Sequence, residues 1–569
     1  MKINKITMLI GSALVVLGMA SCNDFLDKVP DTRVDINTSP EQVRLLLVDG
    51  YMRYNYTIPC EFSTDNVVDN NAPNQNGLRY NLPSYDRMDD EIFRFDDVKS
   101  GTGEDSPSSI WEGCYHAIAA ANHALEAIAK FEADGRGSEV QALKGEALVI
   151  RAFHAFLLTQ VFCMPYRGAE LSKSIQGIPY PTEPETKVLV HYDRGNLADT
   201  YDAIERDLLE GLPLIDDQIY DVPKYHFNRA AANAFAARFY LNKREYDKVL
   251  QYCNAAFGGE AVDPSPYMSN IWSQTNLYYL SDFGRYFTNV LQQRNLLCTA
   301  TYSTAARHFT GGHRYACNGS AKRATIQGPG PSWEKCRWSS SATGETFAMN
   351  PCFYACCFIN GNQEYGTFFG GPLGEQFEYT DKVAGIGFAH IVYPEFTGEE
   401  VLLMRAEAKL FLGDIAGAVA DLKVWDDAHQ INSAGDDRTV PLTAELINDF
   451  YTRYEDSQEF GIAKKIHIDE VCPSDKYSAA GIMPYLQCVQ HFRRIEFIHN
   501  GKRFFDIKRY GIEITHFIGK TDKVTLQVLD PRWAMQIPTE VLSAGMEPNF
   551  RAASPTTDET ARAKFSMAN

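Results

Sequence analysis

Pairs of helical patterns joined by short turns restrict the fold of this chain more than any other feature. Residues 229–242 and 245–259 form one pair, and residues 399–413 and 414–425 form a second. In each pair, alanine and glycine recur at positions where a small side chain lets two helices approach closely. Such helical hairpins are typical of tetratricopeptide-like repeats, so the sequence predicts an all-α (α-rich) fold. Unrelated helices packed in an α domain are the alternative, since the repeat period is not kept strictly.

Residues with capping preferences mark the ends of these helices. Asn228 can cap the helix that begins at residue 229, and Lys243 and Arg244 form the turn to the next helix. Gly258 favours an ending there, and Asp414 is placed to cap the final helix of the second pair. The hairpins are therefore delimited by local sequence.

Three further helices are predicted in the first 220 residues. Apolar residues recur at three- and four-residue steps from about 111 to 129 and from about 139 to 162, and a third helix is expected from about 192 to 212. Pro165 and Pro213 prevent continuation of the second and third. No stretch beyond the first 21 residues is predicted to be long and apolar enough to span a bilayer.

Two long insertions interrupt the helical pattern, from about residue 62 to 109 and from about 260 to 398. Both are rich in Gly, Asn, Asp and aromatic residues, and within the first, residues 85–97 are predicted to form a solvated acidic loop. His308 and His313 of the second are interpreted as polar loop residues. Loops on a rigid helical scaffold are where binding residues are expected.

Residues 1–21 have the pattern of a signal peptide. Lys2 and Lys5 precede a short apolar segment, and small residues follow it up to Cys22. Ordinary cleavage after Ala20 is one interpretation. A bacterial lipobox, cut just before a Cys22 that carries fatty acyl chains such as palmitate, is favoured because the cysteine directly follows the small residues.

Charge and motif content disfavour several classes of function. There are 54 Lys and Arg against 73 Asp and Glu, a formal net charge of -19, and an acidic surface repels the phosphates of nucleic acids. None of the common nucleotide-binding, hydrolase or zinc-protease motifs is present, so no cofactor, metal or catalytic residue is predicted. The 13 cysteines show neither disulfide-scaffold nor zinc-site spacing.

Five segments together resemble the SusD/RagB family of outer-membrane nutrient-uptake lipoproteins. They are the mature start at 22–30, the helices at 110–128 and 142–166, and the segments at 493–511 and 530–550. Met535 and Met546 depart from the family pattern, and residues 351–371 match nothing in it. The resemblance implies one SusD-like domain over 22–569, with an N-terminal part of about 22–220 and a C-terminal part of about 260–569.

The same resemblance implies a function. Four tetratricopeptide-like hairpins would pack against a loop-rich half, and the protein would sit at the cell outer membrane, facing outward and held by its lipid. It would bind an oligosaccharide without performing chemistry, and deliver it to a SusC-like TonB-dependent β-barrel transporter. A peptide- or glycopeptide-binding uptake protein, a surface glycoside hydrolase and an adhesion lipoprotein are the alternatives.

Candidate ligand contacts come from the two insertions, because an aromatic ring can stack on the C–H face of a sugar while polar groups bind its hydroxyls. The alternative for each ring is that it fills the core of its own loop. The candidates are Asp65, Asn66, Tyr80 and Tyr85 in the first insertion, and Trp272, Tyr278, Tyr279, Trp333 and Trp338 in the second.

Overall fold

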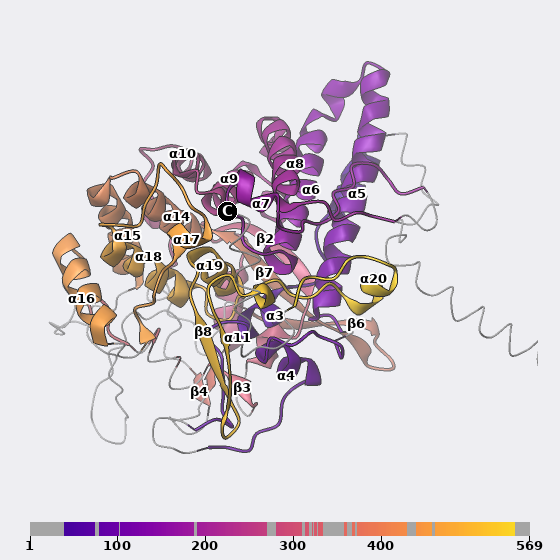
Figure 1. Ribbon diagram of the computed structural model, residues 1–569. Coiled ribbons are helices and arrows are strands. Elements are labelled where there is room, and N and C mark those ends of the chain that lie inside the picture. The colour runs from indigo at the N-terminus through magenta and orange to yellow at the C-terminus, as the bar shows by residue number, and fades with distance from the viewer. Residues whose placement is uncertain are drawn as a thin grey trace, which may run out of the picture.

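Helices form an arc across one half of the molecule, and the insertions and strands fill the other half (Figure 1). The computed structural model describes residues 39–73, 79–101, 103–186, 191–269, 280–309, 313–317, 321, 324–326, 328–333, 358–360, 367–369, 373–429, 440–457 and 461–551. The helices of the arc are α5 (Pro107–Ala133), α6 (Gln141–Phe162), α8 (Leu197–Gly211), α9 (Arg229–Lys243), α10 (Tyr246–Phe257), α14 (Gly398–Phe411), α15 (Ile415–His429), α16 (Ala444–Ser457) and α18 (Met483–Glu496). The prediction of an α-rich fold is confirmed.

The predicted helical hairpins and their caps are confirmed by α9–α10 and α14–α15. Asn228 Oδ1 accepts the Ala231 N–H at 3.0 Å, and α10 ends at Gly258 with a φ of 94°. Asp414 Oδ1 accepts the Gly417 N–H at 2.8 Å. The predicted helix at 192–212 starts later, at Leu197, because Asn196 caps it by accepting the Asp199 N–H.

Helix α6 corrects the expectation about apolar segments. By length and composition it could cross a membrane, yet its most apolar window is wholly buried inside the protein. It packs between α5 and α8, as Figure 1 shows, so its apolar character serves the core of the helical arc.

The second insertion is more regular than predicted, because it contains an antiparallel sheet with the strand order β2–β7–β6. The strands are β2 (Asn295–Tyr302), β7 (Ile386–Thr397) and β6 (Glu375–Asp381). The segment around Ile391, Val392 and Tyr393 joins β-branched and aromatic residues that favour a strand, and its side chains are largely buried. Helix α14 follows directly from β7, so the sheet is continuous with the helical arc.

The remaining elements are short and lie mostly in the lower half of Figure 1. They are α2 (Pro40–Val48), α3 (Thr57–Phe62), α4 (Arg87–Phe93), α7 (Ala169–Ser172), α11 (Leu280–Thr288), α12 (Ala305–His308), α17 (Ile468–Val471), α19 (Lys502–Tyr510), α20 (Thr539–Ser543), β1 (Val68–Asp69), β3 (Tyr315–Ala316), β4 (Phe358–Asn360), β5 (Thr367–Phe369), β8 (Ile514–Ile518) and β9 (Asp522–Leu526).

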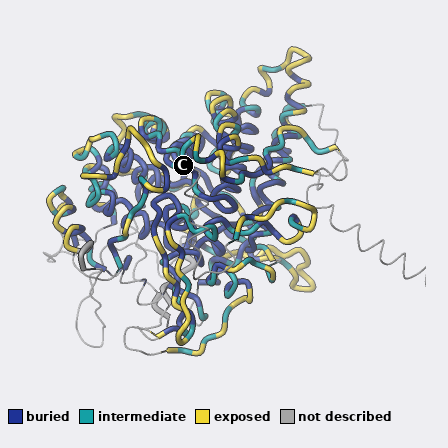
Figure 2. The backbone as a smooth tube through the Cα atoms, in the orientation of Figure 1, coloured by how far each residue is buried: buried dark blue, intermediate teal, exposed yellow. Residues whose placement is uncertain are grey.

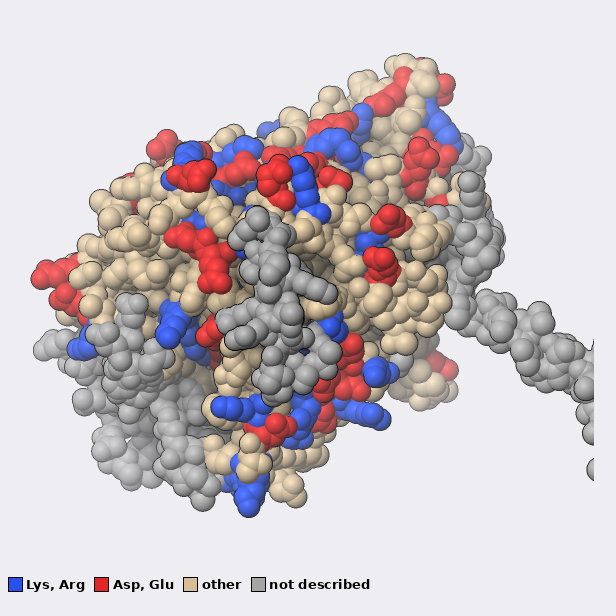
Figure 3. Space-filling view, viewed as in Figure 1, with Lys and Arg blue, Asp and Glu red and all other residues tan. Residues whose placement is uncertain are grey.

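One hydrophobic cluster runs through both halves, from Val43 of α2 to Val541 of α20 (Figure 2). Cys114, Cys163 and Cys253 belong to it as buried free thiols, which act as small apolar core residues. On the face shown in Figure 3, acidic and basic side chains are interspersed. The charges visible on that face therefore form no extended positive surface for a polyanion.

Candidate functional site

The two insertions meet at a short antiparallel strand pair. β1 of the first insertion pairs with β3 of the second, with Asp69 opposite Tyr315. The Arg314 guanidinium stabilises this strand pair. It donates to the Asp69 carboxylate at 2.8 and 3.0 Å and to the Asp90 carboxylate of α4 at 2.9 Å. Segments more than 200 residues apart in sequence are thereby brought to one place, where both can contribute to a site.

Helix α4 begins at this junction and replaces the solvated acidic loop predicted for residues 85–97. Asp86 accepts the Met88 N–H at 2.8 Å, and the Asp89 carboxylate accepts the Asp86 N–H at 3.1 Å, which completes a capping box. Acidic side chains at a helix N-terminus are also favoured by the helix dipole. Tyr85 precedes the cap, so its side chain lies just outside the helix.

Tyr85 is the candidate aromatic that the structure places at the surface. Its side chain is 40% exposed. Its ring centroid lies 4.2 Å from that of His308 and 5.1 Å from that of His313, both in the second insertion. Ring contacts with these imidazoles hold the phenol in place while part of it remains open to a ligand.

His308 provides the buried support for this ring, which corrects its interpretation as a polar loop residue. It is 3% exposed, and its Nε2 lies 3.0 Å from Asp89 Oδ2. The Phe62 ring packs against it at 5.4 Å. Burial, together with the neighbouring His308, lowers the pKa of His313, which favours the neutral form of that imidazole beside Tyr85.

Polar groups border the exposed ring. Arg307, on α12, donates from Nε to Glu375 Oε2 at 2.6 Å, and both side chains are partly exposed. The hydrogen bond with Glu375 raises the pKa of Arg307, so the pair presents a fixed cation beside a carboxylate. We call Tyr85, His308, His313, Arg307 and Glu375 the Tyr85 patch.

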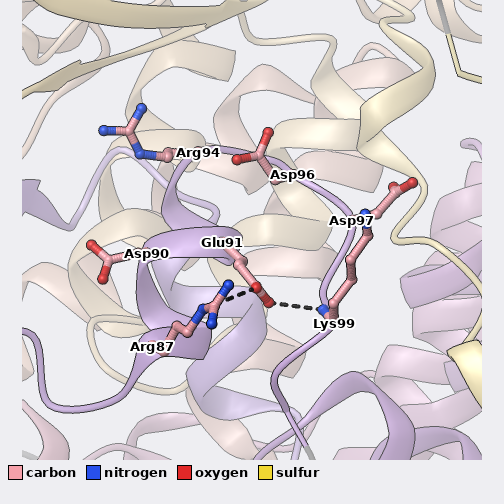
Figure 4. A pocket seen from close by; sticks show the side chains of 7 residues that line it. All are labelled: Arg87, Asp90, Glu91, Arg94, Asp96, Asp97 and Lys99. Atoms are coloured by element: carbon pink, nitrogen blue, oxygen red, sulfur yellow. Dashed lines mark hydrogen bonds and ion pairs between the residues drawn. The ribbon is translucent and has the colours of Figure 1, made fainter.

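A charged groove of about 540 Å³ lies along the outer side of α4 and the segment after it (Figure 4). Glu91 organises it: its carboxylate accepts the N–H groups of Lys99 and Ser100 at 2.8 and 3.1 Å, and Arg87 points toward it at 3.8 Å. Burial raises the pKa of Glu91, but the two amides outweigh it and hold that pKa below its ordinary value. The lining residues are Arg87, Asp90, Glu91, Arg94, Asp96, Asp97 and Lys99.

The Tyr85 patch lies where α4 begins, and the groove runs along α4 and the segment after it, so the two offer complementary chemistry. The patch supplies an apolar ring surface, and the groove supplies alternating donors and acceptors. This combination suits a neutral polyhydroxylated ligand better than a strongly charged one. Among the described residues, no group of three or more His, Cys, Asp or Glu side chains is arranged to hold a metal ion.

Residues 24–241 match a family model, SusD-like, described as starch-binding and associating with the outer membrane. Two solved SusD superfamily structures, from Bacteroides fragilis and Bacteroides thetaiotaomicron, are each 17% identical to this chain, with TM-scores of 0.56 and 0.54. The alignments cover 89% and 90% of this chain and 98% and 100% of those chains. Residues 24–241 are therefore SusD-like, and the chain has the fold of the SusD superfamily structures.

A SusD-like carbohydrate binding protein from Bacteroides vulgatus has the same fold at 13% identity, with a TM-score of 0.50. That alignment covers 89% of this chain and 96% of the other. At these identities the solved structures establish the fold. No curated protein matches the chain in sequence.

Two of the predicted contacts in the first insertion belong to the core of the SusD-like fold. The Asp65 carboxylate lies 3.0 Å from Arg503, 3.1 Å from Lys464 and 3.4 Å from Arg494. Asn66 is fully buried and accepts from Arg494 at 2.9 Å. Asp65 neutralises cations of the C-terminal region, and Asn66 accepts from one of them. The ligand-contact prediction for Asp65 and Asn66 is therefore corrected to a structural role.

Trp333 is corrected in the same way, because the structure bears out the loop-core alternative for it. It is 3% exposed, donates from Nε1 to the Gly328 carbonyl at 3.0 Å, and packs 5.8 Å from the Phe492 ring. A buried indole has no free face for a sugar. Its neighbour Gly330 approaches the ring so closely that a Cβ there would lie 2.1 Å from it.

The other predicted site residues remain predictions. Tyr80 is half-buried, and its N–H donates to the Asn70 carbonyl at 3.2 Å. Trp272, Tyr278, Tyr279, Trp338 and the lipidation candidate Cys22 lie outside the described residues, as does most of 351–371.

Sequence reasoning missed the supporting members of the Tyr85 patch. His308, Arg307 and Glu375 come from one insertion and Tyr85 from the other, and no spacing rule connects them. The available signal was weak: two histidines five residues apart, in an insertion whose one other histidine is His390. The strand pair that unites them is two residues long, too short to predict from a pattern.

Proposed function

We propose that this SusD-like protein binds an oligosaccharide at the cell surface and delivers it to a SusC-like TonB-dependent transporter. The observation that carries the proposal is the match of residues 24–241 to a family described as starch-binding and associated with the outer membrane. The carbohydrate-binding description of the Bacteroides vulgatus structure supports the same class of ligand.

The Tyr85 patch is the proposed contact surface for the glycan. The exposed part of the ring would stack on the C–H face of one sugar unit. Arg307 and Glu375 would donate to and accept from its hydroxyls, and the groove along α4 would take a neighbouring unit. Binding of this kind needs no nucleophile or general base, and the proposal therefore includes no catalysis.

The lipid at Cys22 follows from the signal-peptide pattern of residues 1–21, and the barrel partner from the sequence resemblance. Two or more acyl chains would hold the mature protein at the outer membrane more firmly than one, which binds only marginally. The protein would face outward, with the barrel as its partner and no nucleic acid involved.

Calorimetry against a panel of neutral oligosaccharides tests the proposal. Replacing Tyr85 with alanine removes the stacking ring, and we expect affinity for the glycan that binds wild type to fall about tenfold or more. Tyr225→Ala is the matched control, since Tyr225 is 39% exposed but belongs to a short turn in the helical half.

Equal affinity of wild type and Tyr85→Ala would contradict the assignment of the site. Product analysis of the same incubations separates the alternatives. Shortened glycans would indicate a hydrolase, and retention of peptides in place of glycans would indicate the peptide-binding uptake function.

A further inference from the structure

The β6–β7 hairpin carries the densest group of exposed apolar side chains among the described residues. All seven residues of β6 are exposed, and the hairpin projects from the body beside the label β6 in Figure 1. Isolated exposed apolar residues are ordinary, but a cluster marks an interaction surface. Its members are Phe377 at 42%, Tyr379 at 52%, Val383 at 100%, Ile386 at 60% and Phe388 at 43% exposure.

The backbone of β6 is also open on one side. β7 lies between β2 and β6, so β6 is the edge of the sheet in the part of the chain that the structure describes. An edge strand presents N–H and C=O groups to which another extended segment can pair. Natural edges are often protected by prolines, short length, bulges or charged side chains. β6 has seven residues and no proline, and its protection is limited to three acidic side chains and a register shift after Tyr379.

The apolar side chains of this edge are held in order. Phe377 and Tyr379 lie on the same face of β6, with ring centroids 4.8 Å apart in an edge-to-face arrangement. Phe377 covers Gly387 of β7, where a Cβ would lie 2.8 Å from its ring. The β6 edge therefore presents a preorganised apolar surface in the unbound protein.

Acidic side chains decide which partner fits. Glu375, Glu378 and Asp381 recur every third residue along β6. Glu375 is paired with Arg307, while no ion pair to a basic side chain joins Glu378 or Asp381 within the described residues. Asp381 Oδ1 accepts the Val383 and Ala384 N–H groups of the hairpin turn at 2.8 and 3.0 Å, and Glu378 accepts from the Tyr302 hydroxyl. Both carboxylates are thus held in place, and a cation on an added strand could neutralise them.

A second copy of this chain is a poor occupant. An antiparallel pairing of two β6 strands centred on Glu378 would place Glu378 opposite itself and Glu375 opposite Asp381. Like charges directly opposite on paired strands are destabilising, and the net charge of -19 on each copy adds long-range repulsion.

We propose that the β6 edge accepts an extended strand of a partner protein that alternates basic and apolar side chains. Main-chain hydrogen bonds would supply affinity, Phe377 and Tyr379 would pack the apolar side chains, and Glu378 and Asp381 would bind the basic ones. The Arg307–Glu375 pair joins the base of this edge to the Tyr85 patch. This inference goes beyond glycan binding and does not depend on it.

Two synthetic peptides test the proposal against the full mature protein. One alternates lysine and valine over about nine residues, enough to span β6, and its control has glutamate in place of each lysine. We expect fluorescence anisotropy to show binding of the lysine peptide at least about tenfold tighter than the glutamate peptide. Hydrogen exchange should show new protection of the amides of residues 375–381, which loose electrostatic association would not produce.

Variants assign the effect to the edge. The double substitution Glu378→Lys with Asp381→Lys should reverse the preference between the two peptides, and Tyr379→Ser should weaken lysine-peptide binding about tenfold. Phe517→Ser is the control, since Phe517 is 62% exposed on the separate β8–β9 hairpin. The proposal is overturned if neither peptide binds, if the amides of β6 stay unprotected, or if the charge reversal leaves the preference unchanged.

Discussion

His154 shows how one buried side chain makes stability depend on pH. Its Nδ1 donates to the Ile150 carbonyl at 2.8 Å, and its Nε2 accepts the Met52 N–H at 3.2 Å. It is 1% exposed, and burial lowers its pKa to about 4. Protonation would remove the acceptor on Nε2 and place a charge in the core, so the folded protein keeps this ring neutral.

Acidification should therefore destabilise the protein through this residue. The unfolded chain protonates His154 near pH 6.5 but the folded chain near pH 4, so stability is full above 6.5 and is lost as the pH falls toward 4. Between pH 7.5 and 5.0, wild type should lose about 2 kcal/mol more unfolding free energy than His154→Gln. Denaturant unfolding at both pH values measures this difference.

His191→Gln, at an exposed histidine, is the matched control and should track wild type. If His154→Gln and wild type lose equal stability over this pH range, the ring is protonated in the folded protein and the assignment of its tautomer is wrong.

At the scale of elements, α6 and α8 cross where two glycines face each other. A Cβ on Gly145 would lie 2.8 Å from Leu214 Cβ and 2.9 Å from the Gly211 carbonyl oxygen. A Cβ on Gly211 would lie 2.9 Å from the Gly145 carbonyl oxygen. Both helices therefore depend on the missing side chains for their close approach.

Gly145→Ala should destabilise the protein although alanine is the better helix former. Overpacking against a backbone oxygen costs about 1–3 kcal/mol, which exceeds or offsets the gain of about 1 kcal/mol from helix propensity. Gly113→Ala, in the second turn of α5, is the comparison. Its new Cβ would meet the side chains of Met52 and Tyr54 and no backbone atom, and the flexible Met52 chain can move. Thermal unfolding should rank Gly145→Ala below Gly113→Ala, and the reverse order would contradict the close crossing.

At the scale of the whole molecule, a buried ion network ties the helical arc to the sheet. Arg238 of α9 donates to Glu395 of β7 at 2.6 Å and to Glu400 of α14 at 2.7 and 2.8 Å. Lys502 of α19 donates to Glu400 at 3.0 Å. Burial raises the pKa of Glu400, but Arg238 and Lys502 outweigh it and hold that pKa at about 2. Four elements from distant parts of the sequence therefore share one set of charges.

Removing the central cation should weaken the whole molecule at once. Arg238→Met leaves two buried carboxylates without their main partner, and we expect a loss of about 3–5 kcal/mol in unfolding free energy. Arg238→Lys keeps one charge and should lose less. Arg136→Met removes an exposed ion pair with Glu139, and its unfolding free energy should equal that of wild type. Urea unfolding followed by tryptophan fluorescence and circular dichroism measures all three. Equal unfolding free energies of Arg238→Met and wild type would show that the ion network does not stabilise the fold.

The sequence alone predicted the helical hairpins, their caps and the α-rich class, and the resemblance to the SusD-like family followed from its motifs. Period, capping residues and prolines act over a few residues, so a helix such as α9 is determined by its own segment. The sheet in the second insertion was missed in part because β2 and β7 pair across about 90 residues of intervening sequence, as Thr299 and Tyr393 do.

Tertiary structure alone decided which candidate residues reach the surface. Trp333 and Asn66 read like Tyr85 in the sequence, since all three are ring or polar residues in an insertion. Trp333 and Asn66 are buried because residues far along the chain contact them. Phe492 packs against Trp333, and Arg494 donates a hydrogen bond to Asn66. Tyr85 stays exposed because a capped helix begins directly after it and His308 supports its ring from below. Whether a side chain is buried depends on residues that are distant in sequence, and a local sequence pattern does not identify those residues.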